Sequence, residues 1–250
     1  MASNSNNSKR KKEECLQCAW KSLQHEELTE LEEAVDQAKK GEKKEDELTQ
    51  LIQKIMQHFQ DHSNNRIRLA RNDVSPFFAP TTCTPLENSV LWIAGCRPSS
   101  FIRLIYAVTE FEPDSHVHDP CVEGIVNSDL REISGEQLKM MDELRGKTIR
   151  EERRITTKYA SLQEDIVDQP LVGKMKKEGH DCENADEDLD ELSKRMAGVI
   201  EEADQLRLKT LKEIVNILKP VQAVEYLAAA KKIRLCVEQW GKKRDQEHNP

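Results

Sequence analysis

Apolar residues spaced three and four apart recur through long stretches of this chain, and this spacing is the feature that most restricts its fold. Residues at that spacing share one face of an α-helix. The chain has 250 residues but only 9 Gly and 9 Pro, so few positions interrupt a helix. Aromatic residues make up 4%, whereas a β-rich chain needs more aromatic and turn residues. We therefore predict an all-α fold, a single antiparallel multi-helix bundle.

Five apolar stripes define the long predicted helices. In chain order they run over residues 28–38, 48–59, 138–166, 189–214 and 226–240. Each stripe is wide enough to face a shared core rather than a thin dimer seam. We expect all five to be buried, including Trp240 at the end of the last one.

Segments without helical periodicity lie before and between these stripes. We predict a disordered basic tail over 1–12, one helical domain over 13–245, and mobile loops at about 110–132 and 173–188. The tail carries a short basic cluster that is typical either of a nuclear-import signal or of a solvated terminus. Its residues are Lys9, Arg10, Lys11 and Lys12.

Charge and motifs exclude several classes of function. The formal net charge of -8 makes broad attraction to DNA or to anionic membranes unfavourable. No run of 18 apolar residues is present, so no membrane-spanning helix is predicted. The chain has no Gly-rich phosphate loop and no recognisable catalytic motif. We expect a protein that is not an enzyme.

The densest local signals lie between residues 84 and 104. Thr84 and Glu87 form a capping box around a proline at the first helical position. We predict a short helix from Leu86 to Ala94, which contains Trp92, with Gly95 in a left-handed conformation at its C-terminal end. A second short helix then begins, and its exposed backbone groups can be satisfied by the side chains of Arg97, Ser99 and Ser100.

A charged pair on a later helix has two structural interpretations. Asp204 and Arg207 lie three residues apart and can pair with each other. Arg207 can instead reach the turn between Gly95 and Ser100. We favour a structural role over a direct partner contact, because buried charged groups must be paired.

A partner-binding surface is predicted on the first two helices. It comprises Trp20 and Leu23 together with a basic strip, for which a solvated helix face is the alternative. The strip contains Arg66, Arg68 and Arg71.

Metal-ligand residue types occur in the two irregular segments. They are His116, His118, Cys121, His180 and Cys182. Their spacing fits no standard zinc module, so no metal site is predicted, and exposed histidines in polar loops are the simpler interpretation.

Three segments together resemble a plant family, the Delay-of-Germination domain. They are RNDV at 71–74, TPLENSVLWIAGCRPSSFIRL at 84–104 and ADQLRLKTL at 203–211. That domain occurs alone in seed-dormancy regulators and forms the C-terminal part of TGA-type basic-zipper transcription factors. The segment SLQED at 161–165 is similar to the stand-alone dormancy-type branch. The resemblance covers residues 13–245.

The resemblance implies a non-enzymatic regulator that acts through protein partners in seed development, dormancy or hormone signalling, with a link to transcription. Type-2C protein phosphatases and nuclear transcription regulators are the implied partner classes, and nucleus and cytoplasm the implied locations. The resemblance is also compatible with a homo-oligomer. Two alternatives stay open: a directly DNA-binding transcription regulator, and a sensor of an apolar small molecule or a metal.

Two departures from the family pattern limit what is carried over. A basic zipper needs a continuous basic helix followed by heptads, and the cluster at 9–12 is followed at once by Glu13 and Glu14. Dormancy-type relatives can also carry two histidines one turn apart in the last helix, suited to a haem iron. Arg234 and Glu238 occupy the matching positions, and neither side chain is a usual haem ligand. We therefore predict no cofactor.

Overall fold

The protein is a bundle of α-helices, as the periodic stripes predict. The structure, a computed structural model, describes residues 2–109, 129–168 and 183–248. These residues contain no β-strand, only an isolated bridge between Trp92 and Gly95. The elements are α1 (Ala2–Lys39), α2 (Glu45–Ala70), α3 (Ser75–Phe78), α4 (Pro85–Ser89), α5 (Pro98–Thr109), the 3-10 helix η1 (Asp129–Glu132), α6 (Gly135–Asp168), α8 (Glu183–Ile217) and α9 (Pro220–His248).

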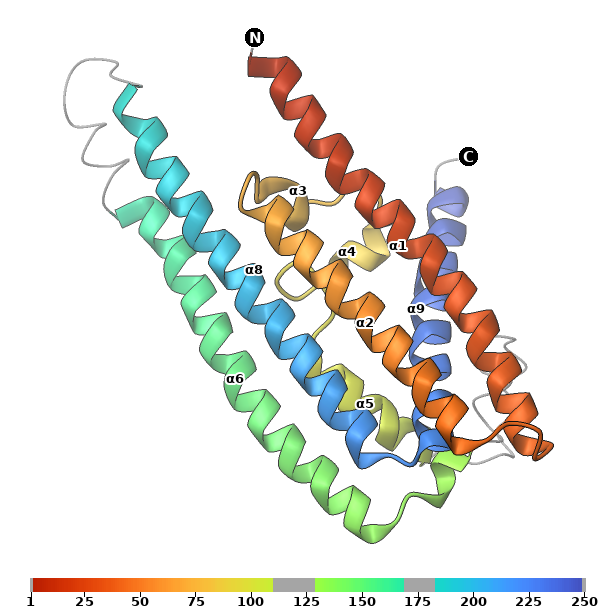
Figure 1. Ribbon diagram of the computed structural model, residues 1–250. Coiled ribbons are helices and arrows are strands. Elements are labelled where there is room, and N and C mark those ends of the chain that lie inside the picture. Colours follow the sequence, from red (N-terminus) through yellow and green to blue (C-terminus); the bar gives the residue numbers. More distant parts are fainter. Residues whose placement is uncertain (1, 110–128, 169–182, 249–250) are drawn as a thin grey trace.

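The five long helices lie side by side, and the short elements fill the space between them (Figure 1). α6 and α8 pack against each other as one antiparallel pair, and α1 packs against α9. α2 contacts α8 on one side and both α1 and α9 on the other. Helix α2 therefore contacts both pairs and helps to join them.

The core consists of two clusters of buried apolar side chains. The larger one contains Leu48 from α2, Ile102 from α5, Ile214 from α8 and Tyr226 from α9, each fully buried. The Tyr226 hydroxyl donates to the backbone carbonyl of Phe101 at 3.2 Å, so its polar end is satisfied in the interior. The second cluster packs α6 and α8 against the short helix α3. The predicted stripes thus supply most of the core.

Three segment boundaries differ from the prediction. Helix α1 begins at Ala2 where a disordered tail over 1–12 was expected, because the Lys- and Glu-rich stretch after residue 8 also favours helix. Residues 129–132 of the expected loop 110–132 form η1. Helix α8 begins at Glu183, inside the expected loop 173–188. The remainder of both loops lies outside the described residues.

The stripe on α9 is only partly buried, contrary to the prediction. Tyr226 is fully buried, whereas Ile233 is 39% and Trp240 46% exposed. The opposite face of this helix is also buried, through Leu227, Lys231 and Leu235. The C-terminal half of α9 therefore presents apolar residues on two sides, and packing against α1 uses only one of them.

Replacing two isoleucines by alanine tests this assignment of the core. We expect Ile200→Ala, at a fully buried position of α8, to lower the free energy of unfolding by about 2–5 kcal/mol. Ile233→Ala, at a partly exposed position of α9, should lower the free energy of unfolding by less than about 1 kcal/mol. Urea unfolding followed by circular dichroism measures both. Equal losses would contradict the packing described for α9.

Candidate functional site

Residues 84–100, which carry the longest family-like segment, form a polar junction that touches five helices. Thr84 and Glu87 meet α1 and α9. The turn at 92–96 receives side chains from α8 and α2. Arg97 and Ser99 meet α6. The junction is therefore the place where elements far apart in the sequence come together.

The turn at 92–96 is built differently from the prediction. Helix α4 ends at Ser89 rather than Ala94, and Gly95 does not have the left-handed conformation. Ile93 and Ala94 have it instead, with φ values of 44° and 59°, which is uncommon for residues with a Cβ atom. Gly95 is needed for space, because a Cβ atom there would lie 2.8 Å from Cζ of Arg207.

Arg207 holds this turn to helix α8. Its guanidinium donates to the carbonyl oxygens of Trp92 at 2.5 Å, Ile93 at 2.9 Å and Cys96 at 2.7 Å, and to Asp204 at 2.6 Å. The predicted pair with Asp204 and the alternative contact with the turn are thus both present. Because a guanidinium has five N–H donors in a fixed plane, one side chain satisfies several buried carbonyls that have no helix partner.

Arg66 completes the network from α2. It donates to Asp204 at 3.0 Å and to the carbonyl of Ala94 at 2.7 Å, and its guanidinium lies over the ring of Phe77. Burial by itself raises the pKa of Asp204, but the charges of Arg66 and Arg207 outweigh burial and hold this pKa below its ordinary value. The carboxylate therefore stays ionised between two cations, which is an arrangement that cross-links helices.

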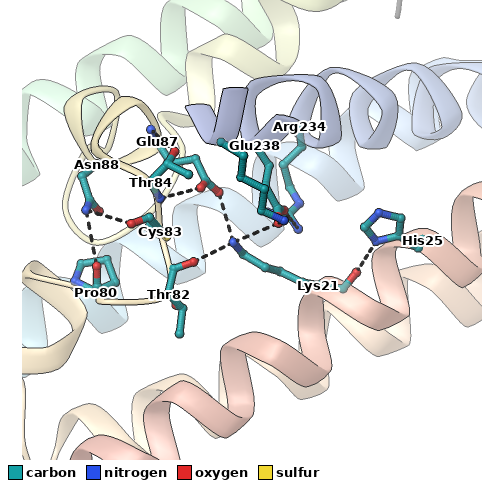
Figure 2. A network of polar contacts seen from close by, with 11 residues as sticks. Lys21, His25, Pro80, Thr82, Cys83, Thr84, Glu87, Asn88, Arg234 and Glu238 are labelled. Carbon is teal, nitrogen blue, oxygen red and sulfur yellow. Dashed lines mark hydrogen bonds and ion pairs between the residues drawn. The ribbon is translucent and has the colours of Figure 1, made fainter. Parts of the chain in front are cut away.

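The other end of the junction rests on the predicted capping box. The amide of Glu87 donates to the Thr84 hydroxyl at 3.2 Å, and the amide of Thr84 donates to the Glu87 carboxylate at 2.8 Å. Figure 2 shows Lys21 of α1 reaching this corner, where it donates to the carbonyl of Thr82 at 2.8 Å and lies 3.4 Å from Glu87. Gly241 of α9 packs so closely on Thr84 that a Cβ atom would overlap the Thr84 side chain.

Glu152 anchors the start of α5, and its role was missed at the sequence level. It is fully buried on α6 and accepts hydrogen bonds from the backbone amide and hydroxyl of Ser99 at 2.5 and 3.0 Å. It also pairs with Arg97 at 2.8 Å, and the Ser100 hydroxyl donates to the carbonyl of Arg97. The sequence shows Glu152 only as one of two adjacent glutamates, so nothing local separates it from a solvated residue.

The predicted partner surface at Trp20 and Leu23 is largely used inside the molecule. Both residues are partly buried. The Trp20 ring stacks on His62 of α2, with centroids 4.0 Å apart, and meets the edge of Phe59. A partly buried tryptophan that stacks on the neighbouring helix holds α1 to α2, and partner binding at Trp20 and Leu23 stays a prediction.

The predicted basic strip is divided among different environments. Arg66 is buried in the network with Asp204. Arg71 pairs with Glu201 of α8 at 2.7 Å, and Arg68 donates to Asn65 one turn earlier. The strip is therefore not a continuous docking surface, because two of its three members bind α8.

Arg234 and Glu238, at the positions considered for haem, belong to the corner shown in Figure 2. Glu238 lies 2.8 Å from Lys242 and 3.4 Å from Lys21, and Arg234 lies 3.8 Å from Glu238. Burial raises the pKa of Glu238, but these positive charges outweigh it and lower the pKa overall. An ionised, ion-paired glutamate does not fit the iron site of a haem, and cofactor content stays a prediction.

In the part of the chain that the structure describes, no group of three His, Cys, Asp or Glu side chains is placed to hold a metal ion. The histidines and cysteines considered as ligands in the two loops lie outside it. None of the described helices is long and apolar enough to cross a membrane.

A pair of glycine substitutions tests the close approach at the turn. We expect Gly95→Ala to lower the free energy of unfolding by about 2–4 kcal/mol, because the new methyl group displaces the guanidinium and leaves buried groups unpaired. Gly198→Ala is the matched control, since its Cβ atom meets nothing within 4 Å and should be neutral or stabilise by up to about 1 kcal/mol. Thermal unfolding of both variants measures the change. If Gly95→Ala has the same stability as the wild type, the role given to Arg207 is refuted.

His62 generates a prediction about pH. Burial, and after it the positive charge of Arg66, lower the pKa of His62 from 6.5 to about 3. A base whose pKa is lowered on folding destabilises the folded state as pH falls below the unfolded value, because only the unfolded chain takes up the proton. Between pH 6.5 and about 3 this contribution has a slope of up to about 1.4 kcal/mol per pH unit.

His62→Phe keeps a ring beneath Trp20 and removes the titration. We expect the variant to lose less unfolding free energy than the wild type when pH is lowered from about 7 to 5, a range above the ordinary pKa values of most carboxylates. Urea unfolding at several pH values measures the difference. Parallel curves for the two proteins would show that His62 takes up a proton in the folded state.

Comparison with known proteins agrees with the motifs at this junction. The family model described as seed dormancy control (DOG1) matches residues 27–107. Protein DOG1-like 1 of Arabidopsis thaliana is 38% identical, with 90% of this chain and 87% of that protein covered. Protein DOG1-like 3 of the same plant is 35% identical, with 91% and 83% covered. Transcription factor TGA6 is 23% identical over 70% of this chain and 48% of its own length. The chain belongs to the DOG1 seed-dormancy family.

Proposed function

We propose that this chain is a non-enzymatic regulatory protein that acts by binding other proteins, in seed dormancy or development or in hormone signalling, with an effect on transcription. Membership of the DOG1 family supports a regulatory role. One relative is named Protein RESPONSE TO ABA AND SALT 1 and another is a TGA transcription factor. These names connect the family with hormone response and with transcription, respectively.

The exposed apolar residues of α9 are the observation that carries this proposal. Ile233, Val237 and Trp240 follow one another at spacings of four and three, so they share one face of the helix. Ile233 and Trp240 are 39% and 46% exposed, and Val237 is partly buried. Tryptophan is among the residues most enriched where binding energy concentrates in protein interfaces. We call these three residues the α9 stripe and propose it as a partner-binding surface.

The partner classes we propose are those that the family resemblance implies. They are type-2C protein phosphatases and nuclear transcription regulators. Location in both the nucleus and the cytoplasm belongs to the same proposal. Arg10, Lys11 and Lys12 of the basic cluster are exposed on α1, as an import signal must be.

Affinity capture from developing seed extract tests the proposal. We expect the wild-type chain to recover a type-2C phosphatase or a transcription regulator, and Ile233→Ala/Trp240→Ala to recover at least about tenfold less, since truncating a central aromatic residue commonly costs about 2 kcal/mol or more. Quantitative mass spectrometry of the captured proteins provides the readout.

Met140→Ala/Leu189→Ala is the matched control, because both side chains are large, apolar and exposed on other helices. Its recovery should equal that of the wild type. Recovery of neither partner class by the wild type would argue against the proposed function. A change in molar mass of the α9 variant, measured by light scattering, would assign the stripe to self-association instead.

A further inference from the structure

Four exposed arginines lie along the boundary between α5 and α6. Arg97 directly precedes α5, Arg103 lies in the middle of α5, and Arg145 and Arg153 come from α6. We call this set the arginine strip. In a chain with a formal net charge of -8, such a concentration of one positive residue type is unexpected.

Two polar contacts fix the strip's geometry. Near the start of α5, Ser99 donates to Glu152, and near its end the Tyr106 hydroxyl donates to Asp142 at 2.6 Å. The two helices therefore run antiparallel, side by side (Figure 1). Arg103 follows Ser99 by four residues and precedes Tyr106 by three, which places it on the edge of α5 that faces α6.

The α6 members lie on the same edge. The guanidinium of Arg145 lies 5.9 Å from the ring centroid of Tyr106. Arg153 follows Asp142 by eleven residues, which is about three helical turns. It therefore lies on the same side of α6 as Asp142. Arg145 and Arg153 are about 12 Å apart along the axis at 1.5 Å per residue. The four guanidinium groups thus border one narrow surface.

Two carboxylates border this surface and offset part of its positive charge. Glu152 is fully buried and bonded to Ser99 and Arg97, and Asp142 accepts a hydrogen bond from the Tyr106 hydroxyl. Burial, and then the hydrogen bond to Asp142, raise the pKa of Tyr106 to about 12, so the hydroxyl stays protonated and keeps donating.

The arginines themselves remain accessible. Arg97 keeps 52% of its side chain exposed despite its pair. Within the described residues, Arg103 and Arg153 have no ion pair, whereas Arg154 and Lys158, elsewhere on α6, both pair with Glu202. Arg103 and Arg153 therefore carry positive charge that no carboxylate of the described residues pairs with.

An apolar patch adjoins one end of the strip. The indole N–H of Trp92 donates to Thr156, which is three residues after Arg153 on α6. Val90, two residues before this tryptophan, is 62% exposed, the largest value among the large apolar residues that the structure describes. A ligand on the strip can therefore make apolar contact at the end where α6 meets the turn.

We propose that the arginine strip binds an acidic segment of a protein partner, with its Asp or Glu carboxylates on the guanidinium groups and an apolar side chain against Val90 and Trp92. Arginine presents paired N–H donors that match a carboxylate. The 12 Å span corresponds to about four residues of an extended peptide at about 3.3 Å each. The inference rests on the proposed function only in requiring a protein partner, and it concerns a surface separate from the α9 stripe.

Fluorescence anisotropy of the full chain with a labelled peptide tests this. The probe is a peptide of about twelve residues, mostly Glu and Asp with a single Leu, at about 150 mM salt, where exposed charges beyond about 8 Å are screened. We expect binding by the wild type and at least a tenfold weaker affinity for Arg103→Glu/Arg153→Glu, equivalent to about 1.4 kcal/mol. Arg103→Gln/Arg153→Gln should show a smaller loss in the same direction.

Lys209→Glu/Lys243→Glu is the matched control, because both lysines are exposed on other helices and the change in net charge is the same. Its affinity should stay within about twofold of the wild type. Equal weakening of both variants would overturn the proposal in favour of general charge attraction, and absence of wild-type binding would overturn it outright. Circular dichroism confirms that each variant is folded.

Two further arms separate this inference from its competitors. Tighter binding of a duplex of about twenty base pairs than of the peptide would overturn the proposal and identify a nucleic-acid surface, with a steep salt dependence. The seed-extract capture is repeated with Arg103→Glu/Arg153→Glu. If this variant recovers the same partners at wild-type levels, the arginine strip is not a partner-binding surface, and the proposed function is unaffected. Loss of recovery by this variant alone supports the strip.

Discussion

Arg207 is the side chain on which the rest of this structure depends. The turn at 92–96 enters the core without helical hydrogen bonds, and backbone carbonyls buried without partners cost free energy comparable to a lost hydrogen bond. Three of these carbonyls accept from Arg207, and Arg66 serves a fourth. The two cations are tolerated in the interior because Asp204 lies between them. One carboxylate and two guanidinium groups thus allow an irregular segment to occupy the centre of a helical bundle.

That segment in turn positions the long helices. Its first residues form a corner with Lys21 of α1 and Gly241 of α9, its middle binds α8 and α2, and its last residues are held by Glu152 of α6. Most of the residues that carry the family resemblance are therefore used to hold helices together. The family pattern therefore describes mainly how the scaffold is built, although Arg97 and Arg103 of the proposed arginine strip also lie within it.

Local signals were predictable from the sequence, and long-range partners were not. The capping box of Thr84 and Glu87 and the pair of Asp204 with Arg207 each involve residues three apart, so spacing alone identifies them. Arg66 meets Asp204 across 138 positions, and its neighbours Arg68 and Arg71 made it look like part of an exposed strip. Trp240 appeared to be a core residue because periodicity shows that a helix has an apolar face, not whether another element covers that face.

The two proposed binding surfaces differ in their physics and in their place. α6 and α9 lie on opposite sides of the bundle (Figure 1). Contacts through the α9 stripe are apolar, so salt should affect them little, whereas contacts through the arginine strip are charge-assisted and should weaken as ionic strength rises. If both proposed surfaces bind partners, salt dependence distinguishes which partner occupies which side. A partner whose capture falls with salt belongs to α5 and α6, and a partner retained in high salt belongs to α9.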